Sequence, residues 1–543
     1  MHLPILSSVL LLAATTAGAA AVSPSCKSSP QDPTWPGLEE WNALNSSIDG
    51  TLLRTAPAAS SCYPGNPSAQ LKTGMDYSIF TNHSRLPLVL WEQIATAMKW
   101  ASERNIRIVI KGTGHDMSGR STGANSLSIW THNLNHFKHE PKWQLPGGNG
   151  TANVAILGSG NNWGSAYTAV HTVNRTIVGG ADATVGLGGL IQNGGHGLMS
   201  STHGLASDNL YQGSVITTDG GRLVANDEQN QQLFWAVRGA GGGQFGVVTE
   251  MSSMVGGLSF YATGKSNASD VAWDALAETA SLIPDLMDSG ITGTLMAESP
   301  TIAGAGAIIS LTSFNSTIAR MNATVNELAS RISKAGHGHM TIVAQAPSTN
   351  SYWNSTKPNQ LASQSSGASS LITSRLLGKR ELSEIERDDL HLYLQQILLS
   401  ADGGSMALFG LQGGPGTANT PEERRGSTHP AWRTAYAHFM TYGAPVNATA
   451  DVSEALATGV EWYEANIEPV WRNWVPGGGS YANEGNIFNS NWKEDFYGEN
   501  YDRLVEVKRE YDPTESLFVW GGVESDLWDY DLHSGLLCRM AVV

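Results

Sequence analysis

The residues best suited to chemistry lie in one short stretch, Lys111–Arg120, which reads Lys-Gly-Thr-Gly-His-Asp-Met-Ser-Gly-Arg. It follows Ile106–Ile110, a run rich in β-branched residues that is typical of a strand. Three glycines let the backbone turn sharply and expose its N–H groups, as in loops that cradle a phosphate. His115 lies in the middle of the turn. The sequence therefore predicts a phosphate-holding loop that carries one imidazole in a fixed place.

Two more glycine-rich stretches follow, from Gly179 to Gly197 and from Arg238 to Val248. Apolar residues such as Val185 and Leu187 are interleaved in the first of them, whereas flexible linkers are polar. Glycine at this density in a folded chain indicates close approach of the backbone to a ligand. We therefore expect several loops, and not one, to surround the same group.

Several common sites do not match these stretches. Residues 186–189 do not open a helix after a strand in a βαβ unit, and no Gly-Lys-Ser/Thr follows as in a P-loop. There is no Gly-x-Ser-x-Gly elbow. His196 and His203 lack Cys or carboxylate neighbours at the usual offsets, so no metal site is expected. A diphosphate held by backbone amides from separate loops is the interpretation that remains.

The elements that must position these loops follow from periodicity. Helical spacing predicts helices over 90–103 and 163–173, with a shorter one near 38–45. Strands are expected at 126–130 and 154–158, and a hairpin at 215–221. After about Met254 the glycine content falls. We expect two helices there, over 323–335 and 382–399, loops at 363–370 and 413–426, and a last helical stretch over 496–512.

Composition describes a large acidic globular protein. The chain has 543 residues, which is more than a single hydrophobic core usually supports, so two or more domains are expected. Hydrophobic residues make up 41% and charged residues 15%, which excludes a disordered chain. The net charge of −16 argues against nucleic acid or an anionic membrane as the main partner.

The N-terminus predicts export. Residues 5–14 are apolar and residues 17–21 are small, which is typical of a cleaved signal peptide and too short for the roughly 20 residues that span a bilayer. We expect a secreted protein with N-glycans, because nine Asn-x-Ser/Thr sequons begin at Asn45, Asn82, Asn149, Asn174, Asn267, Asn315, Asn322, Asn354 and Asn447. Of the three cysteines, Cys26–Cys62 is the expected disulfide and Cys538 is left over, although sequence alone does not fix the pairing.

Four motifs in order resemble the FAD-linked oxidases of the vanillyl-alcohol oxidase/p-cresol methylhydroxylase (PCMH) superfamily, in the berberine-bridge-like branch and closest to fungal secreted, isoamyl-alcohol-oxidase-like members. They are residues 111–121, 184–197, 238–248 and 497–513. The resemblance covers about residues 26–540 and implies a two-domain α+β fold, with a PCMH-type FAD-binding domain and a substrate domain that carries an antiparallel sheet. It implies the following divisions: signal peptide 1–21, N-terminal arm 22–59, FAD-binding domain 60–257, substrate domain 258–475 and C-terminal berberine-bridge-like segment 476–543.

In that family the histidine of the first motif is bonded to the flavin 8α-methyl, and His115 is the matching position. A second bond from a cysteine is common in relatives, but Asp182 stands there, so monocovalent FAD is expected. A further departure is Leu190, where many relatives have His. The resemblance assigns these other cofactor-binding residues: Lys111, Gly112, Thr113, Gly114, Asp116, Gly119, Gly179, Gly180, Asp182, Thr184, Val185, Gly188, Gly189, Gly194, Gly195, Gly197, Gly246, Val247, Val248 and Asn500.

Tyr481 matches the tyrosine of the family's Tyr-x-Asn element, which lies beside the substrate, and is the expected catalytic residue. A tyrosinate could accept the substrate's hydroxyl proton, but with an ordinary pKa near 10 it needs a cationic neighbour. A packed wall residue is the competing interpretation of Tyr481, and Glu484 is a weaker candidate base. His429 and Trp432 match a fungal element and are interpreted as structural.

The expected activity is that of a monomeric, secreted FAD-dependent oxidase. A hydride would pass from a C–H next to O or N of an alcohol or secondary metabolite to flavin N5, and O₂ would reoxidise the flavin to give H₂O₂. A carbohydrate (oligosaccharide) oxidase is one alternative, and a flavin-binding pseudoenzyme with little turnover is another. Asp182 and Leu190 keep the second alternative open.

Overall fold

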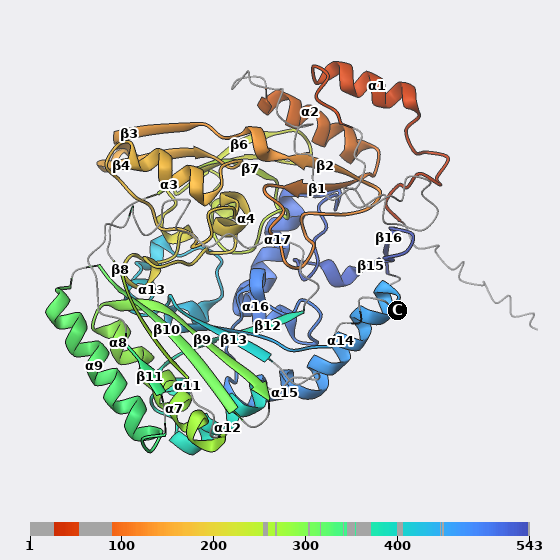
Figure 1. Cartoon of the computed structure of the whole chain (residues 1–543). Coiled ribbons are helices and arrows are strands. Elements are labelled where there is room, and N and C mark those ends of the chain that lie inside the picture. Colours follow the sequence, from red (N-terminus) through yellow and green to blue (C-terminus); the bar gives the residue numbers. More distant parts are fainter. Residues whose placement is uncertain are drawn as a thin grey trace, which may run out of the picture.

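The computed structural model describes residues 26–53, 90–253, 259–265, 269–301, 304–314, 316–339, 341–344, 353, 371–398, 405–445, 447 and 450–540. The signal peptide, Cys62 and the loop predicted at 363–370 lie outside these residues. Two bodies are visible in Figure 1, with a five-stranded sheet above and a seven-stranded sheet below, and the C-terminal helices lie between them. The α+β expectation is confirmed.

The first motif grows out of a small parallel sheet. Strand β1 (Arg107–Lys111) pairs with β2 (Ser126–Trp130), and helix α2 (Leu90–Glu103) packs an apolar face against β1. Parallel neighbours cannot be joined by a tight turn, so the chain must travel back before β2 begins. Residues 112–125 make that return, and they include the loop around His115.

The upper body contains the antiparallel sheet β3-β4-β7-β5-β6. Its strands are β3 (Phe137–Gln144), β4 (Thr151–Gly158), β5 (Gln212–Ile216), β6 (Arg222–Asn226) and β7 (Val247–Ser253). Helix α3 (Trp163–His171) follows β4, and the short helices α4 (Leu187–Gln192), α5 (Ser200–His203) and α6 (Gln231–Ala236) lie between α3 and β7 in the chain. The glycine-rich stretches are thus the connections of this body.

The lower body contains the antiparallel sheet β11-β8-β10-β9-β13-β14-β12. Its strands are β8 (Ser259–Lys265), β9 (Ile291–Thr301), β10 (Gly304–Ser313), β11 (Thr341–Val343), β12 (Ile372–Leu377), β13 (Ser405–Leu411) and β14 (Ala437–Tyr442). Helices cover one face of this sheet in Figure 1, and their apolar side chains form a shared core with it.

The prediction of two helices in this body is wrong. It contains α7 (Ser269–Ser281), α8 (Ile283–Asp288), α9 (Ile318–Ala335), α11 (Lys379–Leu382), α12 (Arg387–Ile397), α13 (Pro415–Ala418), α14 (Val452–Asn466) and α15 (Glu468–Trp474). The helix predicted over 382–399 begins only at Arg387, because α11 ends at Leu382 and the chain turns between them. The loop predicted at 413–426 includes α13 and one turn of 3₁₀ helix, Glu422–Arg424.

The C-terminal segment returns to the upper body. The helix predicted over 496–512 is two helices, α16 (Trp492–Tyr497) and α17 (Tyr501–Tyr511), since the chain turns at Gly498 with a left-handed φ of 52°. Lys508 in α17 is buried and contacts the Asp512 carboxylate at 2.9 Å. The segment ends in the hairpin β15 (Trp528–Tyr530) and β16 (Leu537–Arg539).

The expected Cys26–Cys62 disulfide is wrong, because Cys26 is bonded to Cys538. The backbone N–H of Lys27 also donates to the carbonyl of Leu537 at 2.8 Å. The arm with helix α1 (Leu38–Ser47) is therefore held at the C-terminal hairpin, 512 residues away in sequence. Sequence proximity favoured the wrong partner, since nothing local indicates that the two chain ends meet. Across the described residues, no helix has the length and apolar character needed to cross a membrane.

Candidate active site

Asp116 organises the first loop. One of its carboxylate oxygens accepts hydrogen bonds from the backbone N–H groups of Ser118 and Arg120, and the other contacts the Arg120 guanidinium at 2.7 Å. Arg120 is buried, and its Nη2 also donates to Asn483 Oδ1 at 2.6 Å. A local turn thus holds a buried cation that reaches the C-terminal segment.

His115 is held by the second glycine-rich stretch. Its Nε2 lies 2.6 Å from Thr184 Oγ1, and the Thr184 hydroxyl donates to Asp182 Oδ1 at 2.7 Å. Because the hydroxyl proton points to the carboxylate, the Thr184 oxygen must accept a hydrogen bond from the Nε2–H group. The lone pair of the imidazole is therefore on Nδ1. The chain His115–Thr184–Asp182 fixes both the orientation and the tautomer of the histidine.

The glycine-rich connections fit a group that lies against their backbone. Gly197 packs so closely on the carbonyl of Gly179 that a Cβ would lie 1.8 Å from that oxygen, whereas a Cβ on Gly189 would meet no atom within 4 Å. Ser159 Oγ and Asn193 Oδ1 near this surface are buried and have no hydrogen-bond partner among the described residues. Open backbone with unpartnered polar atoms beside it suits a dinucleotide with a diphosphate.

The other predicted cofactor residues divide into those on this surface and those elsewhere. Gly188 and Gly189 lie in the first turn of α4, and Gly112 and Thr113 lie near its start in the neighbouring loop. Gly246 lies beside the carbonyl of Ile216 and leads into β7, which contains Val247 and Val248. Asn500 donates to the carbonyls of Ser427 and Thr428, so its observed contacts join the C-terminal segment to the loop before strand β14.

Leu190 does not form a free apolar wall. Its two methyl groups fill the space beside Gly180 and Gly195, where an added Cβ would come within 2.8 Å and 2.3 Å of them. The side chain is only partly buried and packs against the core of the upper body. The leucine is explained by loop packing, and its apolar character does not by itself indicate the substrate.

Tyr481 lies at the meeting point of the two bodies and is buried. Its hydroxyl oxygen accepts a hydrogen bond from Asn483 Nδ2 at 2.7 Å, and Asn483 Oδ1 accepts from Arg120 and Asn193. Burial raises the pKa of Tyr481 above its usual range and the Glu484 charge raises it further, whereas Asn483 and Arg120 act in the opposite direction. Arg120 is therefore the cationic neighbour that a tyrosinate would need, although it acts through an amide.

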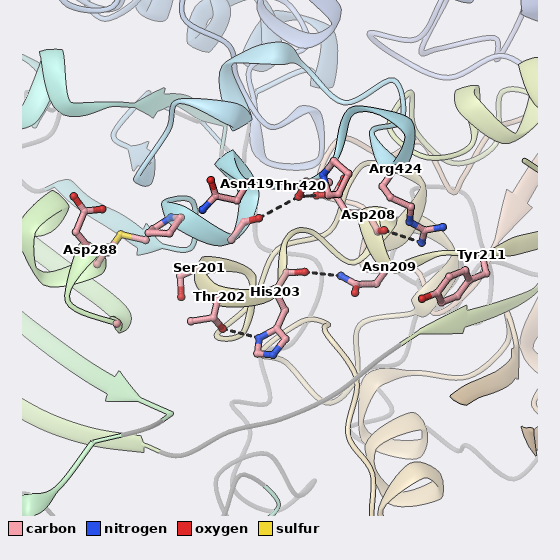
Figure 2. A pocket seen from close by; sticks show the side chains of 15 residues that line it. Ser201, Thr202, His203, Asp208, Asn209, Tyr211, Asp288, Asn419, Thr420 and Arg424 are labelled. Carbon is pink, nitrogen blue, oxygen red and sulfur yellow. Dashed lines mark hydrogen bonds between the residues drawn. The ribbon is translucent and has the colours of Figure 1, made fainter. Parts of the chain in front are cut away.

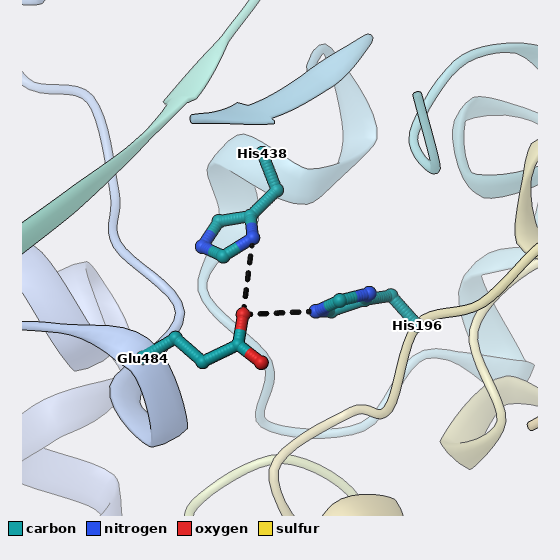
Figure 3. A group of neighbouring side chains, drawn as sticks. All are labelled: His196, His438 and Glu484. Atoms are coloured by element: carbon teal, nitrogen blue, oxygen red, sulfur yellow. Dashed lines mark hydrogen bonds and ion pairs between the residues drawn. The ribbon is translucent and has the colours of Figure 1, made fainter. Parts of the chain in front are cut away.

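Beside Tyr481 is a group that sequence spacing did not indicate. His196 Nε2 lies 3.4 Å from Glu484 Oε2, and His438 Nδ1 lies 3.3 Å from the same oxygen (Figure 3). The three side chains come from the Gly-Gly-His-Gly loop, the 3₁₀ turn Ala482–Glu484 and strand β14. The Tyr481 ring meets both imidazoles edge-on, at 4.8 Å and 5.6 Å between centroids.

The electrostatics of this group favour a neutral imidazole and an ionised carboxylate. The pKa of His438 is lowered to about 4, mainly by burial and to a smaller extent by His196, against the attraction of Glu484. Burial alone would raise the pKa of Glu484, but the hydrogen bond of His196 and the attraction of both imidazoles lower it below its usual range. Glu484 is thus an ionised, partly exposed carboxylate between two imidazole rings.

His429 and Trp432 have structural contacts, as their sequence context predicts. His429 Nδ1 accepts from the N–H of Ala431, and its Nε2 contacts the carbonyl of Glu494 at 3.0 Å. Trp432 is 1% exposed and packs edge-on against Tyr481 at 6.0 Å between centroids. A ring buried to this extent cannot stack on a substrate without a rearrangement.

The structure also contains a cavity of about 490 Å³ that is lined by residues of both bodies (Figure 2). His203, Asp208, Asn419 and Arg424 are among its lining residues, and no predicted site residue lines it. The Asp208 carboxylate is paired with Arg433 at 2.7 Å. His203 thus lines this cavity, whereas His196 does not.

Two polar residues of the site, His438 and Asn193, were not predicted from the sequence, and neither was the role of Arg120. Arg120 follows Asp116 at the i,i+4 spacing, which was a usable signal. His438 carries no such signal, since it lies in the strand Ala437–Tyr442, which is otherwise buried and mostly apolar. Its partner Glu484 is 46 residues further along the chain, so only the pairing of β14 in the sheet brings them together.

Comparisons with known proteins show the family of the chain. A family model described as "FAD binding domain" matches residues 90–226, and one described as "Berberine and berberine like" matches residues 480–519. The chain is 33% identical over 571 residues to the VAO-type flavoprotein oxidase VAO615 of Thermothelomyces thermophilus, covering 95% of this chain and 96% of that protein.

Solved structures share the fold. The crystal structure of the VAO-type flavoprotein MtVAO615 from Myceliophthora thermophila C1 aligns with a TM-score of 0.79 and 28% identity, over 95% of this chain and 100% of the other. Glucooligosaccharide oxidase from Acremonium strictum, described with a 6-S-cysteinyl, 8α-N1-histidyl FAD, aligns over 80% of this chain and 90% of its own, with a TM-score of 0.63 and 17% identity. The second likeness concerns the fold alone.

Proposed function

Because the chain belongs to the berberine-bridge-like branch of the VAO/PCMH superfamily of FAD-dependent oxidoreductases, we propose that it oxidises a C–H bond next to oxygen or nitrogen in an alcohol or secondary metabolite. We further propose that O₂ is the electron acceptor and H₂O₂ the second product. The relative of 33% identity is named an oxidase, which supports the choice of O₂.

One observation carries this proposal. The hydrogen-bonded chain Asp116–Arg120–Asn483–Tyr481, in which Arg120 and Tyr481 are buried, runs from the loop that bears His115 to the residue expected beside the substrate. The polar atoms of the cofactor loop and of the substrate side are thereby fixed relative to each other. Such preorganisation is what a transfer between two bound groups requires.

Bound FAD would supply the acceptor for the hydride, and the side chains described above would place the substrate. In the proposal Tyr481 contacts the substrate hydroxyl as a tyrosinate: its own phenol proton leaves to solvent before the substrate binds, and the phenolate then receives the proton of the substrate hydroxyl. Asn483 donates to the phenol oxygen, which stabilises negative charge on it, and the Arg120 charge polarises that amide. The surrounding rings of His196, His438 and Trp432 exclude water from the phenol.

We propose that Nδ1 of His115 forms the one covalent bond between the protein and the flavin. The Thr184–Asp182 pair supports this, because it holds the proton on Nε2 and leaves Nδ1 nucleophilic. The described cysteines, Cys26 and Cys538, form a disulfide, which leaves neither of them for a second bond. Asp182, which first counted against activity, thereby receives a role in cofactor attachment.

The test is to denature the purified protein and measure flavin fluorescence that stays with the polypeptide. Wild type and a His203→Ala control should retain it, whereas His115→Ala should lose all of it. Flavin that washes off wild type would contradict the covalent assignment, and label retained in His115→Ala would move the bond to another residue.

Substrate class is tested separately by H₂O₂ release on panels of alcohols, aromatic metabolites and oligosaccharides. The fold neighbour named as a glucooligosaccharide oxidase makes oligosaccharides the second candidate. The burial of Trp432 counts against them, since sugars commonly rest on an exposed aromatic face. Lack of release on every panel, with flavin that does not bleach, would favour the pseudoenzyme alternative.

We also propose that the protein is a secreted, N-glycosylated monomer. Four of its sequon asparagines in the described residues, Asn149, Asn174, Asn322 and Asn447, are exposed, which supports glycan attachment. The signal peptide and four other sequons lie outside the described residues. Mass spectrometry before and after glycosidase treatment of secreted material tests the proposal.

A further inference from the structure

His196, His438 and Glu484 bring two imidazole nitrogens and one carboxylate oxygen to a single point. All three atoms lie within 4.8 Å of one another. Among the described residues, this is the group of three His, Cys, Asp or Glu side chains whose ligand atoms converge in this way. The residues come from three separate segments, which places the group at the junction of both bodies and the C-terminal segment (Figure 3).

The distances within this group are unusual for hydrogen bonds to an ionised carboxylate. Such bonds are normally about 2.7–2.9 Å long, whereas the two nitrogens lie 3.3 Å and 3.4 Å from Glu484 Oε2. Two ligands of a tetrahedral ion with bonds of 2.0–2.2 Å are about 3.3–3.5 Å apart. The Glu484 oxygen and each nitrogen thus have the spacing of two ligands around one ion.

We propose that His196, His438 and Glu484 bind a divalent transition-metal ion, for which zinc is the best fit. Two imidazoles and one carboxylate form a ligand set that zinc accepts, whereas calcium and magnesium prefer oxygen ligands alone. Three protein ligands also leave a coordination position for water or for an oxygen of the substrate. The three ligand atoms lie within 4.8 Å of one another. If the two imidazole nitrogens are separated by that full distance, one imidazole must turn toward the ion when the ion binds.

The environment of the group suits such an ion. His438 is 2% exposed, while Glu484 keeps 26% and His196 keeps 15% of the side-chain surface exposed, so the point of convergence can be reached from one side. Tyr481 and Trp432 pack against the rings on other sides, at 4.8 Å and 5.8 Å from His196 between centroids. These aromatic rings hold the ligands in place and restrict access of water.

The expected affinity for the metal ion depends on the imidazole nitrogens that do not face the ion. A metal-bound histidine usually donates its other N–H to a protein acceptor, and loss of such a partner costs about 10–100-fold in affinity. His196 Nδ1 and His438 Nε2 are buried without a hydrogen-bond partner among the described residues. We therefore expect weaker binding than in zinc sites whose histidines are supported in this way.

The experiment uses the flavin-loaded, full-length protein after treatment with a chelator. Zinc is titrated by calorimetry, and metal content after gel filtration is measured by mass spectrometry. One zinc ion per chain is expected for wild type. His438→Ala and Glu484→Gln should each bind at least about tenfold more weakly, because loss of a ligand costs more than loss of its support. His203→Ala, in the cavity that His196 does not line, should bind like wild type.

Flavin absorbance and the melting temperature report whether each variant has folded. A variant that keeps both and loses zinc supports the site. Wild type that takes up less than a tenth of an ion per chain would overturn it, as would folded His438→Ala and Glu484→Gln proteins that bind zinc as wild type does. Cobalt offers a second readout for wild type, since three or four ligands of this type give intense visible absorption bands.

Discussion

The loops around His115 and the cluster around Glu484 hold polar side chains in two different ways. Thr184 is fixed by Asp182 only two residues away, and together they position His115 across a short distance between neighbouring loops. Glu484 meets His196 from 288 residues away. The loops around His115 therefore hold their geometry through contacts between neighbouring loops, whereas the cluster around Glu484 exists only when distant segments dock. In the proposed function these are the cofactor side and the substrate side, respectively.

That docking depends on a buried ionic group. Arg375 in β12 contacts Glu468 at 3.0 Å and Asp495 at 2.6 Å, and all three side chains are nearly inaccessible to solvent. The neighbouring Ser374 bonds to Ser480 at 2.7 Å, directly before Tyr481. The C-terminal segment thus reaches Tyr481 and Glu484 from a buried contact with the lower sheet.

The largest expected effect is on turnover, and it leaves cofactor attachment unchanged. Tyr481→Phe should lower kcat about 10²–10⁴-fold, the usual contribution of a positioned proton acceptor, while covalent flavin stays at wild-type levels. Stopped-flow reduction of the flavin and fluorescence of denatured protein measure the two quantities. Tyr393→Phe, which packs on Trp474 away from the site, is the control. Turnover within twofold of wild type would leave Tyr481 as a packed wall residue.

The second effect is on stability. Arg375→Leu should lower the free energy of unfolding by about 3–5 kcal/mol, because it leaves Glu468 and Asp495 buried without their cation. Denaturant unfolding measures the loss. If the lower sheet anchors the substrate side, the loss should be accompanied by lower activity of the folded fraction.

Arg380→Leu is the matched control for this variant. Arg380 pairs with Glu381, but 63% of its side chain is exposed, so its removal should cost about 1 kcal/mol or less. Equal losses in the two variants would mean that the buried group is not an anchor, and the contrast between the two sides of the site would fail.

The same contrast explains what sequence alone could predict. Helix α2 and strand β2 have the predicted bounds, since their apolar periodicity is strong and local. His115, the glycine-rich connections and the family also follow from short motifs. Helix α14 was not predicted, although the sequence contains a signal for its start. Asp451 is a typical N-cap residue, and in the structure its carboxylate accepts from the N–H groups of Ser453 and Glu454.

Long-range partners were not accessible in this way. Cys538 carries no local sign that it meets Cys26, and Glu484 carries none that it meets His438. Their proximity depends on the order of strands in a sheet and on the path of the C-terminal segment. The strand order and the path of this segment result from the packing of the whole chain, so no short stretch of a single sequence indicates them.

A third effect tests the local network on the cofactor side. Asp182→Asn should slow covalent attachment about 10–100-fold, because a hydrogen bond to a charged group is worth roughly 1.5–3 kcal/mol. The rate is measured as flavin bound over time when apoprotein is mixed with FAD. Asp219→Asn is the control, since Asp219 accepts from Thr217 and Gly221 in the same pattern at a hairpin away from the site. Equal rates for both variants would remove Asp182 from the attachment step.

The smallest effect concerns pH and the docking of the C-terminal segment by His429. The pKa of His429 is lowered to about 4, mainly by burial and also by the charge of Arg375, against the opposing effect of the hydrogen bond to Glu494. The folded protein therefore holds this imidazole neutral against the carbonyl of Glu494. The unfolded chain, with an ordinary pKa near 6.5, binds the proton first as pH falls. Stability from this group is therefore complete above pH 6.5 and is lost between pH 6.5 and 4. Between pH 7.5 and 5.5 the loss is about 1.4 kcal/mol.

His429→Asn should remove that slope while its side-chain oxygen still accepts from the N–H of Ala431, in place of Nδ1. Urea unfolding at the two pH values, compared with wild type, isolates the contribution because other groups titrate equally in both proteins. The exposed His533→Asn should keep the wild-type slope. A wild-type slope in His429→Asn would mean that the histidine is protonated in the folded protein, and the neutral contact to Glu494 would then not be part of the docking that the substrate side requires.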